Sequence, residues 1–162
     1  AAVNTPADAL GFLNKQINRT LNTIKDGMDM SLCAVNLKKM ELQYAGANNP
    51  LYIVRKGELI ELKADKQSIG ADVEHSEVKT FTNHCFPLEI GDCIYLFTDG
   101  YADQFGGTAG KKFKYKQFHN LLIDLYKLPM KEQSRVLDAR HLTWRGDLEQ
   151  VDDILIIGFR IH

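Results

Sequence analysis

Two apolar runs in the sequence each have a carboxylate at one end. The run Ile94–Phe97 is long enough for one buried strand, and it ends abruptly on a Thr-Asp-Gly sequence at residues 98–100. Near the C-terminus, two aspartates at 152–153 lead directly into a second run, Ile154–Phe159. A carboxylate at a strand end, followed by glycine, which tolerates unusual backbone conformations, is one way to present a metal ligand. Two such strands could bring carboxylates together around hard cations.

The remaining elements are predicted from periodicity and turn signals. A Thr-Pro-x-Asp start at residues 5–8 and apolar residues three and four positions apart predict a helix over about 6–24. Strands are expected at Met30–Leu37, Met40–Ala45, Leu51–Arg55, Glu58–Leu62, Val78–Thr82 and Cys93–Phe97, with Lys56-Gly57 as a hairpin turn. Two helices at about 114–127 and 129–145 and a last strand at about 153–161 complete the chain. This order is typical of an α+β fold, and the two apolar runs predict strands covered on both faces by layered sheets and outer helices.

Composition limits the class of protein. The 162 residues fit one domain, 1–162, with room for a core, and the apolar fraction of 44% indicates neither disorder nor a membrane span. The net charge of −1 argues against a general nucleic-acid binder. Cys33 and Cys93 lie in apolar runs and are expected to be reduced core residues. This favours the cytoplasm, including the cytoplasmic part of a larger, membrane-anchored protein.

Four ordered motifs extend across the chain, at residues 26–32, 44–52, 97–104 and 150–154. Together they resemble the SpoIIE-type branch of the metal-dependent (type 2C, PPM) protein serine/threonine phosphatases. The resemblance implies an α-β-β-α sandwich of two antiparallel sheets flanked by helices. It also implies a binuclear Mn²⁺ or Mg²⁺ centre at one sheet edge and phosphoserine or phosphothreonine proteins as substrates.

The same resemblance assigns the metal ligands. Asp99 matches the aspartate of the family's Thr-Asp-Gly motif, and Asp152 matches the late aspartate of the second metal position. Two roles remain open for Asp153: its carboxylate could lie beside the metals, or it could face solvent. Without the resemblance, Asp99 would be a turn residue and Asp152 a cap at a strand start. Oxygen ligands suit Mg²⁺ and Mn²⁺, and two such cations lower the pKa of a bound water and neutralise phosphate oxygens.

One motif of the family is not found in this sequence. The Asp-x-x-Gly-His-Gly segment, whose aspartate bridges the two metals, is expected before residue 1, together with the first strands of the fold. The chain is therefore predicted to be the C-terminal part of a phosphatase domain and to be inactive alone.

The predicted function is hydrolysis of phosphoserine or phosphothreonine on a regulatory protein of bacterial signalling, such as an anti-sigma-factor antagonist. An upstream sensor domain is expected, with no nucleic-acid partner and no direct membrane contact. An exposed strand edge predicts pairing between copies. The alternative function is a non-catalytic module that keeps the phosphatase fold and binds a partner protein.

The loop at 105–114 has two interpretations. Lys111, Lys112 and Lys114 could cover the site and attract an anionic phosphoprotein, or they could form an ordinary solvated basic loop.

Overall fold

The computed structural model describes residues 3–20, 27–70 and 80–162. The chain divides into two compact units, and each is described by itself: residues 1–51 with 61–89, and residues 52–60 with 90–162. The single domain expected over 1–162 stays a prediction. None of the described helices has both the length and the apolar character that a bilayer crossing requires.

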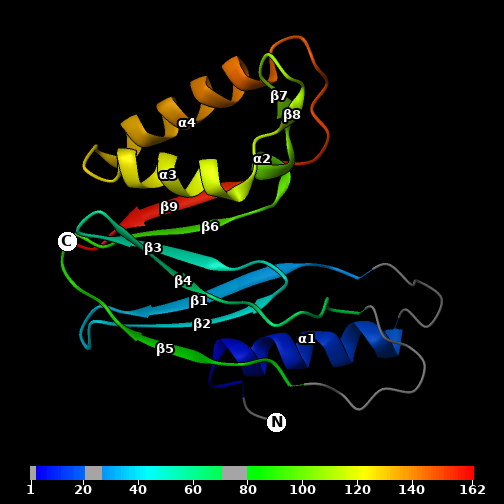
Figure 1. The fold of residues 1–162 in the computed structure, drawn as a ribbon. Coiled ribbons are helices and arrows are strands. Elements are labelled where there is room, and N and C mark those ends of the chain that lie inside the picture. The colour runs from blue at the N-terminus through cyan, green and yellow to red at the C-terminus, as the bar shows by residue number, and fades with distance from the viewer. Residues whose placement is uncertain (1–2, 21–26, 71–79) are drawn as a thin grey trace. The chain divides into compact units, whose positions relative to one another are not determined.

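The first unit is a three-stranded antiparallel sheet with one helix against it (Figure 1). Its elements are α1 (Pro6–Thr20), β1 (Met30–Asn36), β2 (Glu41–Ala47) and β5 (His84–Pro87), in the sheet order β1-β2-β5. The predicted helix start is confirmed: the backbone N–H of Asp8 donates to Thr5 Oγ1 at 3.1 Å, while the Thr5 N–H donates to Asp8 Oδ2 at 3.0 Å. This reciprocal cap satisfies two donors that a helix start would otherwise leave open. Leu10 of the helix packs with Ala45, Ala47 and Phe81 in the core of this unit.

The second unit contains a four-stranded sheet in the order β4-β3-β6-β9. Its elements are β3 (Leu51–Arg55), β4 (Glu58–Leu62), β6 (Cys93–Phe97), α2 (Gly100–Asp103), β7 (Phe105–Gly106), β8 (Lys111–Lys112), α3 (Tyr115–Leu125), α4 (Met130–Arg145) and β9 (Ile156–Arg160). Lys56 and Gly57 both have positive φ angles, 52° and 87°, which a tight two-residue hairpin turn requires. The strands β3, β4 and β6 have the bounds that the sequence predicts.

An aromatic cluster holds the helices of this unit to its sheet. The ring of Phe97 lies 4.6 Å from that of Tyr52 and 5.1 Å from that of Phe118, measured between centroids. Phe118 on α3 is fully buried, and the sheet face that it covers also carries α4 (Figure 1). The strand β6, which ends just before Asp99, is thereby fixed in position.

Four expectations from the sequence are corrected. No strand forms at 80–82, because the N–H and hydroxyl of Thr82 bond to the Asp65 carboxylate instead of a neighbouring strand; Val78 and Lys79 lie outside the described residues. The strand His84–Pro87, which the sequence did not predict, pairs with β2. The loop at 105–112 contains a short hairpin, β7–β8.

The fourth correction concerns the last strand. It begins at Ile156 instead of 153, and it is the end strand of the described sheet. Ile157 is 50% exposed, so β9 is not covered on both faces among the described residues, contrary to expectation.

These results confirm the α+β class with antiparallel sheets and helices.

Candidate functional site

Asp99 lies where the buried strand β6 passes into the short helix α2. It occupies the position just before the helix, and its backbone carbonyl accepts a hydrogen bond from the Asp103 N–H at 2.9 Å. Its side chain makes no capping hydrogen bond to the helix backbone. The carboxylate is therefore not used to start α2, although the sequence position resembles a cap.

Thr98 joins this strand end to the segment that contains the other aspartates. Its hydroxyl donates to the backbone carbonyl of Asp153 at 2.8 Å and accepts from the N–H of Leu155 at 2.9 Å. The Thr98 N–H also donates to the Leu155 carbonyl at 3.0 Å. These three bonds hold residues 98 and 153–155 side by side before the regular pairing of β6 with β9 begins.

Gly100 permits a close approach at the same point. A Cβ atom at this position would lie 2.5 Å from the carbonyl oxygen of Asp153, well inside van der Waals contact. Only a glycine lets the start of α2 lie against this segment without displacing it. The structure therefore brings the backbone at Asp99 and the 152–153 segment to one end of the paired strands β6 and β9.

The 152–153 segment is exposed and held by its own hydrogen bonds. Asp152 Oδ1 accepts from the N–H of Asp153 at 2.7 Å, and Gln150 Nε2 donates to the Asp152 carbonyl at 2.8 Å. The segment precedes β9 and has no regular strand partner. Its carboxylates can therefore face solvent or a cation.

The carboxylates of Asp99 and Asp103 both act on the side chain of Tyr115. Burial raises the pKa of Tyr115, and the carboxylates of Asp99 and Asp103 raise it further. Lys112 partly offsets this charge because its Nζ lies 2.8 Å from Asp103 Oδ2. A cation near Asp99 would thus experience an attractive field.

The donor chemistry fits a hard divalent cation, but the described residues give an incomplete ligand set. Asp99, Asp152 and Asp153 offer oxygen ligands, which Mg²⁺ and Mn²⁺ prefer. Over residues 3–20, 27–70 and 80–162, no three or more Asp, Glu, His or Cys side chains are grouped closely enough to hold a metal. Asp99 and Asp152 as metal ligands therefore stay predictions.

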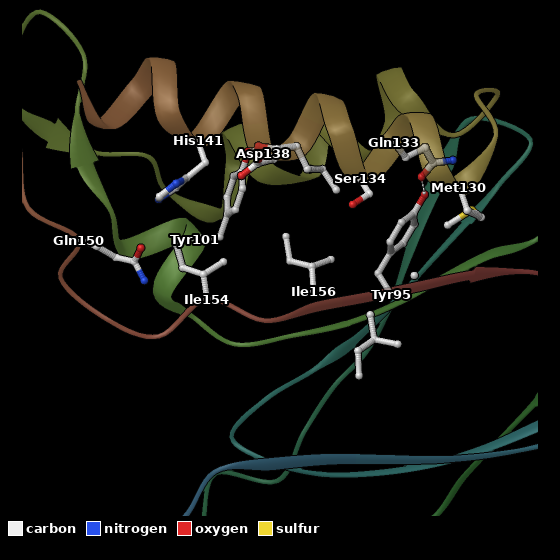
Figure 2. A pocket seen from close by; sticks show the side chains of 13 residues that line it. Tyr95, Tyr101, Met130, Gln133, Ser134, Asp138, His141, Gln150, Ile154 and Ile156 are labelled. Carbon is white, nitrogen blue, oxygen red and sulfur yellow. Dashed lines mark hydrogen bonds between the residues drawn. The ribbon is translucent and has the colours of Figure 1, made fainter. Parts of the chain in front are cut away.

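A pocket of about 600 Å³ lies next to this end of the strands, inside the second unit. Figure 2 shows His141, Asp138 and Ser134 projecting into it from α4, toward Ile154 and Ile156 on the opposite side. Gln150 and Ile154, which line one end, flank the two aspartates. The hydroxyl of Tyr95 in its wall is already used, donating to Gln133 Oε1 at 2.7 Å.

His141 is the least satisfied polar group of this pocket. It is 8% exposed, and its buried Nε2 has no hydrogen-bond partner among the described residues. Burial lowers the pKa of its imidazole, with a further decrease from Arg145 and a smaller opposing effect of Asp138. Sequence reasoning missed this environment, because nothing local to a helical histidine indicates which cavity it faces.

The other acidic and cysteine residues have structural surroundings. Asp29, in the first unit, accepts hydrogen bonds from Asn48 and Ser68 at 2.8 and 2.6 Å. Asn48 has a φ of 58°, in the left-handed region that asparagine tolerates in turns. Cys93 is buried, whereas Cys33, expected in the core, is only half-buried, and both are free thiols.

Comparisons with known proteins agree with these features. The family model of stage II sporulation protein E (SpoIIE) matches residues 1–162. The SiaA-PP2C domain of Pseudomonas aeruginosa is 33% identical, with a TM-score of 0.89 over 98% of this chain and 61% of that chain. This chain therefore spans less than two thirds of that solved domain. No curated protein sequence matches it.

More distant solved structures share the fold. The phosphatase domain of the cell-fate determinant SpoIIE from Bacillus subtilis is 15% identical, with a TM-score of 0.59 over 99% of this chain and 75% of that chain. PppA, a key regulatory component of T6SS in Pseudomonas aeruginosa, is 17% identical, with a TM-score of 0.66 over 98% of this chain and 71% of that chain.

Proposed function

We propose the following function for this chain, which belongs to the stage II sporulation protein E (SpoIIE) family. The function that the site supports best is metal-dependent hydrolysis of phosphoserine or phosphothreonine on a regulatory protein of bacterial signalling. The observation that carries this proposal is the pair of Thr98 hydrogen bonds to residues 153 and 155, which keeps the backbone at Asp99 and the 152–153 segment at one end of β6 and β9.

In this proposal Asp99 and Asp152 hold Mn²⁺ or Mg²⁺, and the Asp153 carboxylate adds negative charge beside them. The bound cations would supply positive charge for the phosphate oxygens and a lowered pKa for water. A solved structure of the Bacillus subtilis SpoIIE phosphatase domain is described as presoaked with Mn, which supports Mn²⁺ as the first cation to test. Thr98 and Gly100 are the residues that position the two segments.

The substrate is proposed to be a phosphorylated regulatory protein, with an anti-sigma-factor antagonist as the first candidate. A sensor domain in the same polypeptide and a cytoplasmic site of action belong to the same proposal. Because the described residues provide an incomplete ligand set, we expect this chain alone to release little or no phosphate.

The experiment measures Mn²⁺-dependent phosphate release from a phosphoserine protein, by this chain and by the full protein as encoded. Asp99→Asn and Asp152→Asn should each abolish release by the full protein, since each removes a charged ligand. Asp124→Asn is the matched control because Asp124 is an exposed aspartate of α3. Folded full protein that releases no phosphate with either cation would reject the enzyme in favour of a non-catalytic, partner-binding module.

A further inference from the structure

The β7–β8 hairpin is fixed against the end of α4. The N–H of Gly107 donates to the Trp144 carbonyl at 2.8 Å, and Trp144 Nε1 donates to the Gln104 carbonyl at 3.0 Å. Gly106 lies so close that a Cβ there would be 1.9 Å from the Trp144 carbonyl oxygen. The segment that the sequence suggested as a loop therefore has a rigid base.

A small pocket of about 240 Å³ lies between this hairpin and Trp144. The residues that matter for its chemistry are Thr108, Lys111, Lys112, Lys114, Gln117 and Trp144. None of the described residues that line it is a carboxylate, although acidic residues slightly outnumber basic ones in the whole chain, 21 to 20. The pocket is thus a local concentration of positive charge on a nearly neutral protein.

Two of the three lysines remain available for a ligand. Lys112 is committed, because its Nζ forms an ion pair with Asp103 at 2.8 Å and lies 5.9 Å from the centre of the Phe105 ring. Lys111 and Lys114 are exposed, and neither forms an ion pair with a carboxylate of the described residues. Two ammonium groups beside an aromatic wall and a hydroxyl suit one carboxylate.

The pocket is connected directly to the helix that follows Asp99. The N–H of Lys114 donates to the Ala102 carbonyl at 2.7 Å, and the N–H of Asp103 donates to the Asp99 carbonyl at 2.9 Å. The four-residue helix α2 therefore separates the pocket from Asp99. Its length, with side-chain reach, corresponds to a separation on the order of 10 Å. About three residues of extended peptide cover that separation.

We propose that this pocket is a substrate subsite, which binds an acidic side chain about three residues from the phosphorylated serine or threonine. The proposal rests on the proposed phosphatase function, since the phosphoryl group would lie at Asp99. It favours the first of the two interpretations of the basic segment, because the base of the hairpin is held by hydrogen bonds and two of its lysines form no ion pair among the described residues. The class of substrate is then a phosphoprotein with acidic residues around its phosphorylation site.

Trp144 provides a direct readout of binding. It is the single tryptophan of the chain and it lines the pocket, so its fluorescence reports occupancy without any hydrolysis. The chain is titrated with phosphoserine peptides that carry Glu three residues before or after the phosphoserine, and with the same peptides carrying Gln. One of the two Glu peptides should bind roughly three- to tenfold more tightly than its Gln partner, and added salt should reduce the difference.

Lysine variants test which side chains cause the preference for the Glu peptide. Lys111→Gln and Lys114→Gln should remove the preference for Glu, and Lys111→Arg should keep it because the charge is kept. Lys131→Gln is the matched control, since Lys131 is an exposed lysine at the opposite end of α4 from Trp144. Equal binding of Glu and Gln peptides would overturn the subsite. An equal response to an oligonucleotide of the same charge would also overturn it, because it would indicate a general polyanion surface.

A kinetic experiment distinguishes failure of the proposed subsite from failure of the proposed phosphatase function. In the full protein, Lys114→Gln should raise KM for the Glu peptide toward the KM of the Gln peptide, whereas the control Lys131→Gln should leave the difference between the two peptides unchanged. Hydrolysis of both peptides with the same KM would reject the subsite and keep the phosphatase. A preference for Glu in binding, without hydrolysis of any substrate, would keep the acidic-peptide site and reject the phosphatase.

Discussion

The hydroxyl of Thr98 donates a hydrogen bond to the backbone carbonyl of Asp153, a residue 55 positions further along the chain. The same oxygen accepts from the N–H of Leu155. One side chain thus sets the spacing between the end of β6, with Asp99, and the aspartate pair before β9. In the proposed metal site, carboxylates that share a cation would have to be held against their mutual repulsion, and this hydroxyl would supply that restraint.

Thr98→Val removes the hydroxyl and keeps the branched shape. Because residues around a metal site orient its ligands, we expect Mn²⁺ affinity to fall about 10- to 100-fold in the full protein, with the fold retained. Thr98→Ser should keep most of the affinity. Calorimetric Mn²⁺ titration measures both, and equal affinities for the valine variant and wild type would show that the hydroxyl has no part in the site.

Gly100→Ala tests the close approach of α2 to the 153 carbonyl. The added methyl would lie 2.5 Å from that oxygen, so the free energy of unfolding should fall by about 1–3 kcal/mol. Gly11→Ala is the control, because that position in α1 has no atom within 4 Å of the new Cβ. There we expect stabilisation of about 0.5–1 kcal/mol, since alanine is the better helix former. Denaturant titration compares the two, and equal stabilities would contradict the packing described.

A partly buried ion pair joins β3 to the residue before β6. Arg55 Nε and Nη2 lie 2.8 and 2.7 Å from the two carboxylate oxygens of Asp92, which is 1% exposed. Asp92→Asn should lower the free energy of unfolding by about 1.5–3 kcal/mol, because it weakens two charge-assisted hydrogen bonds between a buried carboxylate and a partly buried guanidinium. Asp103→Asn, in the exposed pair with Lys112, should cost less than about 1 kcal/mol. Similar losses in the two variants would argue that burial of the first pair has no energetic effect.

The burial of His141 predicts a pH dependence of stability. The folded state has a lowered pKa for this imidazole, whereas the unfolded chain has a pKa of about 6.5. Below about pH 7 the unfolded chain therefore binds more protons, and the free energy of unfolding falls as the pH decreases. His141→Phe should flatten this decrease between about pH 7 and pH 5.5, whereas His162→Gln at the exposed C-terminus should not. Parallel pH profiles for wild type and His141→Phe would refute the assignment.

The end strand β9 predicts association between copies. Its one charged residue, Arg160, is bonded to the carbonyls of Tyr126 and Leu128, it has no proline, and Ile157 is half exposed, so most of its edge lacks the usual protection against pairing. Light scattering of this chain should show a mass that rises with concentration, and Ile157→Lys should reduce that rise. A monomer at all concentrations would contradict the prediction.

Local signals were sufficient for much of the fold. The cap at residues 5–8, the turn at Lys56-Gly57 and the apolar run of β6 each depend on neighbours within a few residues, and each appears as predicted. The predicted strand at 78–82 is wrong for its described residues, 80–82. There Thr82 donates its hydrogen bonds to Asp65, a residue distant in sequence, instead of to a neighbouring strand.

The sequence by itself determined the α+β class, the family and the three aspartates proposed for the metal site. The tertiary structure decided which side chains meet. It alone placed the Thr98 hydroxyl against residue 153, left His141 Nε2 in a pocket without a hydrogen-bond partner from the described part of the chain, and set Trp144 beside the lysines of the hairpin. The physical reason is range: propensities and caps act over one or two turns, whereas these contacts join residues tens of positions apart, and only the packing of the core brings them together.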